Sequence, residues 1–271
     1  MKKLILFLFI IVLSYFGIEQ IVTTNALENK SFSQTTVSED ATNTGDLVLI
    51  NNNHPLNDNA VPTDIVALSS LDTTNFTFEP TVEMSEQLLQ PFSEMMKAAQ
   101  LDGVHHFIVN SSYRNNTAQQ QLYDTMGADL ALPPGYSEHN AGLSIDIGST
   151  SGQMAGSQEA RWLAKNAAVY GFILRYPPNK THITNIDHEP WHYRYVGLPH
   201  SYIIDKNNWT LEEYLAYLQK EKSIQITFKG KRYEVHYYHL SDSLSIPLPT
   251  NYPYQLSGDN MGGIIITIEE S

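Results

Sequence analysis

Helical patterns of apolar residues occur in four stretches of the chain. The longest covers residues 82–99, where apolar side chains recur every three or four positions and Gly103 provides a stop. Residues 117–126 and 158–170 are predicted to be helices that end at the glycines following them. The fourth helix is predicted to open with Thr210-Leu211-Glu212-Glu213, which has the sequence of a capping box.

Strands are predicted between these helices and after the last of them. Residues 143–148 alternate strictly, so the apolar residues Leu143, Ile145 and Ile147 fall on one face, with Ser144 and Asp146 on the other. Further strands are predicted at 106–109, 172–176, 192–196, 224–228, 233–239 and 264–268. Helices and strands are mixed without a repeating βαβ order, which predicts an α+β fold.

Four regions follow from the pattern. Residues 1–24 contain Lys2 and Lys3 followed by an uncharged apolar run, which is typical of an export signal; its length fits either a cleaved signal or a retained membrane anchor. Residues 25–63 are rich in Ser, Thr, Asn and Asp and predict a flexible spacer. Residues 64–221 form the predicted main domain, and 222–271 a short β appendage. The body of the protein is therefore expected on the extracytoplasmic side of the membrane.

The composition limits the partners and the catalytic or metal-binding groups that the protein can have. The formal net charge of −13 argues against nucleic acid as a partner, because binding phosphates requires clustered Lys and Arg. The chain has no cysteine, which excludes disulfides, a catalytic thiol and thiolate-bound metals. A metal ion would have to be bound by His, Asp or Glu.

The segment His188-Glu189-Pro190-Trp191-His192 matches the His-Glu-x-x-His pattern of helical zinc proteases. That pattern requires a helix, but Pro190 disfavours one and the following Tyr-Arg-Tyr-Val favours a strand. We therefore predict a turn entering a strand, in which Glu189 and His192 face one metal and His188 is a bystander.

Two other residues complete a possible metal site. A catalytic zinc ion commonly has three protein ligands and one open position. His139 follows a Gly-Tyr-Ser turn, and Asp146 lies on the polar face of its predicted strand. Together with His192 they would provide a nitrogen–oxygen set, although spacing alone does not bring the three together.

Three separated motifs share their order with a known family. They are Ser137-x-His139-x-x-Gly142-x-Ser144-x-Asp146, then Glu189-x-Trp191-His192, and upstream Ser111-x-Tyr113-Arg114 with Gln119 and Leu122-Tyr123. These motifs resemble those of the VanY-type zinc D-alanyl-D-alanine carboxypeptidases of the LAS group, over about residues 84–220.

The resemblance implies a fold and a set of roles. The fold is LAS/hedgehog-like, with a small central antiparallel sheet flanked by helices. One Zn²⁺ ion would be bound by His139, Asp146 and His192. Glu189 would be the general base, and Arg114 would stabilise the oxyanion. Candidates for substrate binding are Ser137, Tyr113 and Gln119.

The implied activity is removal of the terminal D-Ala from peptidoglycan precursors that end in D-Ala-D-Ala, contributing to glycopeptide (vancomycin) resistance. A D-Ala-D-Ala dipeptidase, an L,D-carboxypeptidase and an endopeptidase are alternatives within the same fold. A wall-binding module without activity is a further alternative, but it would not need Glu189. A serine peptidase is disfavoured, because the chain contains no Ser-x-x-Lys.

Overall fold

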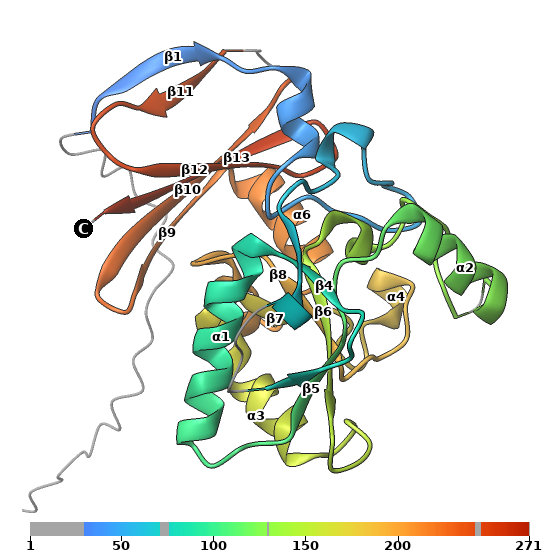
Figure 1. The fold of residues 1–271 in the computed structure, drawn as a ribbon. Helices are drawn as coiled ribbons and strands as arrows, with labels where there is room; N and C mark the ends of the chain where they lie inside the picture. Colours follow the sequence, from blue (N-terminus) through green and yellow to red (C-terminus); the bar gives the residue numbers. More distant parts are fainter. Residues whose placement is uncertain (1–29, 71–75, 129, 242–244, 271) are drawn as a thin grey trace, which may run out of the picture.

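A five-stranded sheet forms the centre of the main domain (Figure 1). The computed structural model describes residues 30–70, 76–128, 130–241 and 245–270. The strands follow the order β3 (Thr77–Phe78), β5 (Phe107–Ser111), β6 (Ser144–Ser149), β8 (His192–Tyr195) and β7 (Phe172–Leu174). Neighbouring strands are antiparallel except for the parallel pair β3–β5. The prediction of an α+β fold with a small, mainly antiparallel sheet is confirmed.

One face of this sheet is covered by helices α1 (Glu86–Leu101) and α3 (Gln158–Asn166) (Figure 1). Apolar side chains of both helices form one core with those of the strands; Ile145 and Ile147 are fully buried there. Side chains alternate along a strand, so burying Ile145 and Ile147 directs Asp146 to the opposite face. The alternation of apolar and polar residues in β6 therefore predicts which face of the sheet carries Asp146.

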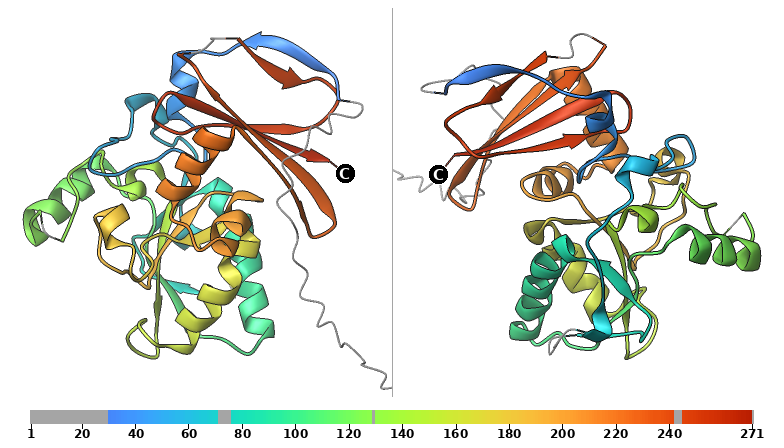
Figure 2. Two further views of the ribbon diagram at one scale, coloured as in Figure 1. Left: turned by 180° about the vertical axis from the view of Figure 1, so that it is seen from behind. Right: turned by 45° about the horizontal axis from the view of Figure 1, so that its top comes forward.

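A second sheet lies beyond helices α5 (His200–Lys206) and α6 (Leu211–Glu221) (Figures 1 and 2). Its strands are all antiparallel, in the order β12 (Tyr254–Gly258), β13 (Gly263–Glu270), β10 (Lys231–His239) and β9 (Ser223–Phe228). Helix α6 begins at the predicted capping box, in which Thr210 and Glu213 exchange hydrogen bonds. Its apolar face shares a core with Ile173 of β7, so the second sheet is joined to the main domain by buried contacts.

Smaller elements complete the fold. Strand β2 (Ile65–Ala67) pairs with β4 (Glu83–Ser85), and β1 (Phe32–Thr36) pairs with β11 (Ser245–Pro249) over the outer face of the second sheet. The short helices are α2 (Asn116–Met126) and α4 (Thr181–Thr184). The 3₁₀ turns are η1 (Glu39–Asn43), η2 (Asp58–Ala60), η3 (Leu68–Ser70), η4 (Glu138–Ala141) and η5 (Ala167–Tyr170).

The segment predicted to be a flexible spacer is packed against the rest of the molecule over its described part, residues 30–63. Leu47 and Leu49 lie in the core under the second sheet, whereas Val48 and Ile50 contact Ala141 and Leu143. All four residues 47–50 are at most 4% exposed. This corrects the expectation of a flexible spacer. The segment was predicted to be flexible because polar residues dominate its composition, although it contains the short apolar run at 47–50. The boundaries at 64 and 222 stay predictions.

The predicted signal or anchor at residues 1–24 lies outside the described residues. Among the residues that the structure does describe, no helix has both the length and the apolar character needed to cross a membrane.

His200, at the junction between the two sheets, predicts a pH-dependent stability. Its ring is buried, with Nδ1 2.7 Å from the Tyr214 hydroxyl and Nε2 2.9 Å from the Thr267 hydroxyl. Burial lowers the pKa of His200 to about 3, so the unfolded chain takes up a proton near its ordinary pKa of about 6.5 while the folded protein does not. This contribution to stability is complete above about pH 6.5 and is lost as the pH falls toward 3.

We expect the free energy of unfolding of the wild type to fall relative to that of His200→Gln by about 1.4 kcal/mol per pH unit below pH 6. Urea denaturation of both proteins at pH 7, 6 and 5 measures this difference. Parallel pH profiles would contradict the assignment.

Candidate metal centre

Three predicted ligands converge on the polar face of the central sheet. The register of β6 and β8 places Asp146 directly opposite His192, and turn η4 brings His139 against both. The potential ligand atoms of the three residues lie within 4.8 Å of one another. His139 Nε2 is 3.3 Å from Asp146 Oδ2, and His192 Nδ1 is 3.2 Å from Asp146 Oδ1.

Turn η4 has the shape that this convergence requires. The Ser137 hydroxyl accepts a hydrogen bond from the His139 backbone N–H at the start of the turn, with a distance of 3.4 Å. Gly142 ends it with φ +66°, a conformation that favours glycine. A Cβ atom there would lie 3.2 Å from Pro62 Cγ and 3.4 Å from Ser85 Cβ, which explains the glycine in the motif.

Each histidine ring is oriented by a hydrogen-bond partner on its far side. His139 Nδ1 contacts the Ser112 carbonyl, and His192 Nε2 lies 3.4 Å from Glu138 Oε2. A proton on each of these nitrogens leaves His139 Nε2 and His192 Nδ1 bare and facing Asp146. Both rings are therefore oriented to bind a cation.

The donor set fits zinc. Two imidazole nitrogens and one carboxylate are a common zinc ligand set. The buried Asp146 Oδ1 accepts no hydrogen bond, although it lies 3.2 Å from His192 Nδ1. Two acceptors facing each other are satisfied by a cation between them. Burial alone would raise the pKa of Asp146, but the two histidines hold it well below its usual range, so the carboxylate is ionised.

The two histidines differ in their electrostatic surroundings. Burial disfavours the charged form of His192, but the nearby carboxylates of Asp146 and Glu138 outweigh burial and raise the pKa of His192 to about 9. The pKa of His139 is lowered, chiefly by burial. The carboxylates of Asp146 and Glu138 thus favour positive charge at His192.

Glu189 lies at the edge of the centre. Its Oε2 is 3.5 Å from His192 Nδ1, and its side chain remains 29% exposed. Burial, together with the nearby carboxylates of Asp146 and Glu138, raises the pKa of Glu189 above its ordinary value. A partly exposed carboxylate with a raised pKa is suited to accept a proton.

The His188–His192 segment is not helical. Residues 187–189 have no regular structure, and β8 begins at His192. His188 Nδ1 contacts the Tyr176 carbonyl at 2.8 Å instead of the centre. The prediction of a turn entering a strand, with His188 a bystander, is confirmed.

Arg114 faces the centre from the other side. Its Nη2 is 3.8 Å from Asp146 Oδ2, and its backbone N–H donates to the His139 carbonyl at 3.0 Å. Nη1 donates to Gln119 Oε1 at 2.8 Å, and Nη2 donates to Ser111 Oγ at 3.3 Å. Burial lowers the pKa of Arg114, but a guanidinium stays charged at neutral pH.

The three predicted substrate-binding residues lie near the centre in different environments. Gln119 is buried, and its Nε2 donates to the Leu132 carbonyl at 2.6 Å while its oxygen accepts from Arg114. Ser137 is 7% exposed and caps η4. Tyr113 is half-buried, next to Arg114, and its backbone N–H donates to the Glu83 carbonyl. Substrate contact by these residues stays a prediction.

The contacts of Gln119 predict that it acts through Arg114. Gln119→Met keeps the volume but leaves Arg114 Nη1 without its acceptor, and a hydrogen bond to a charged group contributes about 1.5–3 kcal/mol. We expect kcat to fall about tenfold or more, with unchanged zinc content. Steady-state kinetics and metal analysis measure both, and an unchanged kcat would contradict this role.

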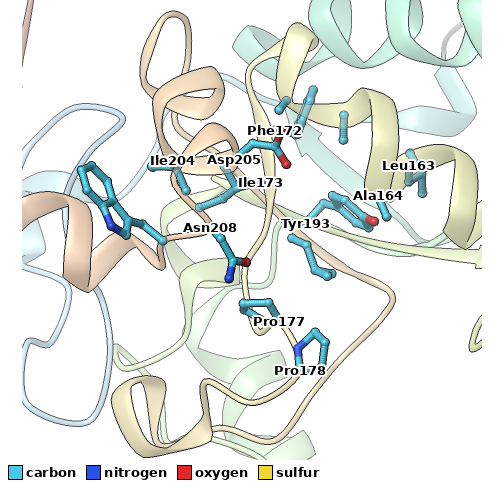
Figure 3. A pocket seen from close by; sticks show the side chains of 14 residues that line it. Leu163, Ala164, Phe172, Ile173, Pro177, Pro178, Tyr193, Ile204, Asp205 and Asn208 are labelled. Atoms are coloured by element: carbon cyan, nitrogen blue, oxygen red, sulfur yellow. The ribbon is translucent and has the colours of Figure 1, made fainter. Parts of the chain in front are cut away.

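A pocket of about 210 Å³ lies beside the edge strand β7, between residues of α3 and α5 (Figure 3). Tyr193 lines this pocket, whereas its neighbour His192 points to the candidate metal centre. The pocket lining contains no histidine, and Asp205 is its single carboxylate. The pocket therefore takes no part in the centre.

Three buried charged residues near the centre had no role in the sequence analysis: Glu138, Arg175 and Arg194. Each is at most 1% exposed. Arg175 Nε donates to Glu138 Oε1 at 2.8 Å, and Arg194 Nη1 donates to the same oxygen at 2.7 Å. The sequence alone could not pair Glu138 with these arginines, since they lie 37 and 56 residues away from it.

Comparisons with known proteins agree with this geometry. The VanY family model, described as D-alanyl-D-alanine carboxypeptidase, matches residues 81–198. A D-alanyl-D-alanine carboxypeptidase of Enterococcus faecium is 45% identical over 249 residues, which cover 89% of this chain and 82% of the relative.

Two solved structures are also similar. The vancomycin resistance D,D-dipeptidase VanXYg, in complex with a D-Ala-D-Ala phosphinate analog, has a TM-score of 0.78 at 27% identity and covers 89% of this chain and 100% of its own. A mutant of the vancomycin resistance D,D-pentapeptidase VanY from the VanB-type cassette, in complex with Zn(II), has a TM-score of 0.51 at 32% identity. It covers 63% of this chain and 98% of its own.

Proposed function

Since this chain belongs to the VanY family of D-alanyl-D-alanine carboxypeptidases, we propose that it is a zinc D,D-carboxypeptidase that removes the terminal D-Ala from peptidoglycan precursors ending in D-Ala-D-Ala. One zinc ion is bound by His139, Asp146 and His192. The observation that carries this proposal is the convergence of these three ligands, with Glu189 on one side and Arg114 on the other. By removing the terminal D-Ala, the enzyme contributes to glycopeptide resistance.

The chain's own residues divide the reaction between them. When bound, zinc supplies a Lewis acid that polarises a carbonyl and makes water more acidic. Glu189 accepts a proton from the attacking water and transfers it to the departing amine of D-Ala. Arg114 stabilises the negative charge that develops on the scissile carbonyl oxygen, because its guanidinium is already aimed into the centre by Gln119 and Ser111.

The place of action follows from the substrate. Precursors ending in D-Ala-D-Ala are exposed outside the membrane, and the basic, apolar start of the chain is the feature that would export the body or anchor it there. The net charge of −13 offers no general attraction for an anionic precursor, so the carboxylate of the precursor has to be bound by local groups of the site.

The decisive assay uses the purified full chain and a pentapeptide ending in D-Ala-D-Ala. We expect release of D-Ala that is abolished by 1,10-phenanthroline and restored by added Zn²⁺. Activity that the chelator does not affect would contradict the metal assignment.

A D-Ala-D-Ala dipeptidase is the second candidate. The similarity to the D,D-dipeptidase VanXYg over 89% of this chain favours it. Both candidates use the same centre, so relative kcat/KM values for the pentapeptide and the free dipeptide distinguish them. A preference for the free dipeptide would support the second candidate.

A further inference from the structure

Glu138 is a buried carboxylate between the metal centre and two arginines. Its Oε1 accepts hydrogen bonds from Arg175 Nε at 2.8 Å and Arg194 Nη1 at 2.7 Å. Its other oxygen, Oε2, lies 3.4 Å from His192 Nε2. One oxygen is therefore occupied by the arginines, and the other faces the back of a predicted zinc ligand.

The two arginines have further hydrogen-bond partners, which restrain the orientation of Glu138. Arg175 Nη1 and Nη2 donate to the two carboxylate oxygens of Glu212 on α6, at 3.0 and 2.6 Å. Arg194 Nη2 donates to the backbone carbonyls of Asp46 and Val48, both at 2.9 Å. This network connects the N-terminal segment, helix α6 and turn η4 behind the centre.

We infer that Glu138 is a positioning residue that keeps the proton of His192 on Nε2 and thereby leaves Nδ1 to bind the metal. An ionised carboxylate only accepts hydrogen bonds, so His192 Nε2 must be the donor in this contact. Partners of this kind commonly determine the tautomer of a metal-binding histidine and tune metal affinity. The inference rests on the proposed zinc site.

The fixed arginines make Glu138→Gln a specific probe. The oxygen of the glutamine would remain on the side of Arg175 and Arg194, because both are donors. Its amide N–H₂ would then face His192 Nε2 and favour the tautomer with the proton on Nδ1. A protonated Nδ1 has no free lone pair with which to bind a metal. The variant keeps the volume of Glu138 but reverses the hydrogen bond.

The test compares zinc affinity in Glu138→Gln and Glu212→Gln by competition with a chromophoric chelator. Both variants remove one carboxylate from Arg175, but only Glu138 contacts His192. We expect Glu138→Gln to weaken zinc binding about 10–100-fold and to lower kcat more than it changes KM. Glu212→Gln should keep wild-type zinc affinity, with any effect confined to thermal stability.

Equal loss of zinc affinity in both variants would mean a general structural effect and overturn the inference, as would wild-type affinity in Glu138→Gln. A wild type that binds no zinc would refute the proposed function itself, so the two failures are distinguishable.

A measurement on the wild type keeps the inference testable if Glu138→Gln does not fold. In zinc-loaded protein, ¹⁵N NMR should show His192 protonated at Nε2 and metal-bound at Nδ1. The opposite pattern would overturn it.

Discussion

Glu189→Gln should lower kcat by about 10²–10⁴-fold while zinc content stays at the wild-type level. Glutamine matches the shape of Glu189 but cannot accept a proton, and the three proposed ligands remain in place. The side chain lies 3.5 Å from His192 Nδ1 and keeps 29% exposure, so it can reach a water at the centre. Steady-state release of D-Ala and metal analysis of the same preparation measure both quantities.

A control lies on the same loop. Asp187 is exposed and two residues from Glu189, so Asp187→Asn removes a nearby carboxylate without touching the centre. This control should keep wild-type kcat. Near-wild-type kcat in Glu189→Gln would refute the role of Glu189 as general base.

Arg114→Ala should lower kcat by about 10²–10³-fold, because removing one preoriented donor from an oxyanion costs this much in comparable sites. Arg114→Lys should recover little of the loss, since lysine lacks the forked geometry that reaches Gln119 and Ser111. Zinc content should remain unchanged in both variants, because Arg114 is not a ligand.

Exposed Arg161 provides the matched control, since it lies on α3, which covers the opposite face of the sheet, and Arg161→Ala should leave kcat unchanged. If Arg114→Ala raised KM alone, Arg114 would bind the substrate without stabilising the transition state.

Local patterns predicted most of the elements. Helices α1 and α6 have an apolar face and clear ends within their own sequence, and β6 alternates strictly. These signals operate over a few residues, so they can be read without knowing the rest of the fold. The strands β1 and β11 gave no comparable signal, because their pairing joins residues more than 200 positions apart.

In the candidate site, too, the sequence predicted the residues but not the contacts between them. The motifs and the family resemblance identified His139, Asp146 and His192 as ligands, and the structure brings the three together. Spacing alone could not do so, because the contact between Asp146 and His192 depends on the register of β6 with β8.

The sequence by itself determined the type of fold, the residue types able to bind a metal in a chain without cysteine, and the face of β6 that carries Asp146. Only the tertiary structure decided how the centre is oriented. The buried ion network joins three distant parts of the chain, at Glu138, Arg175 and Arg194. Arg194 also donates a hydrogen bond to the backbone carbonyl of Val48, in the segment that was predicted to be flexible. The physical reason is that burying a charge requires partners, and folding alone determines which distant side chains become those partners.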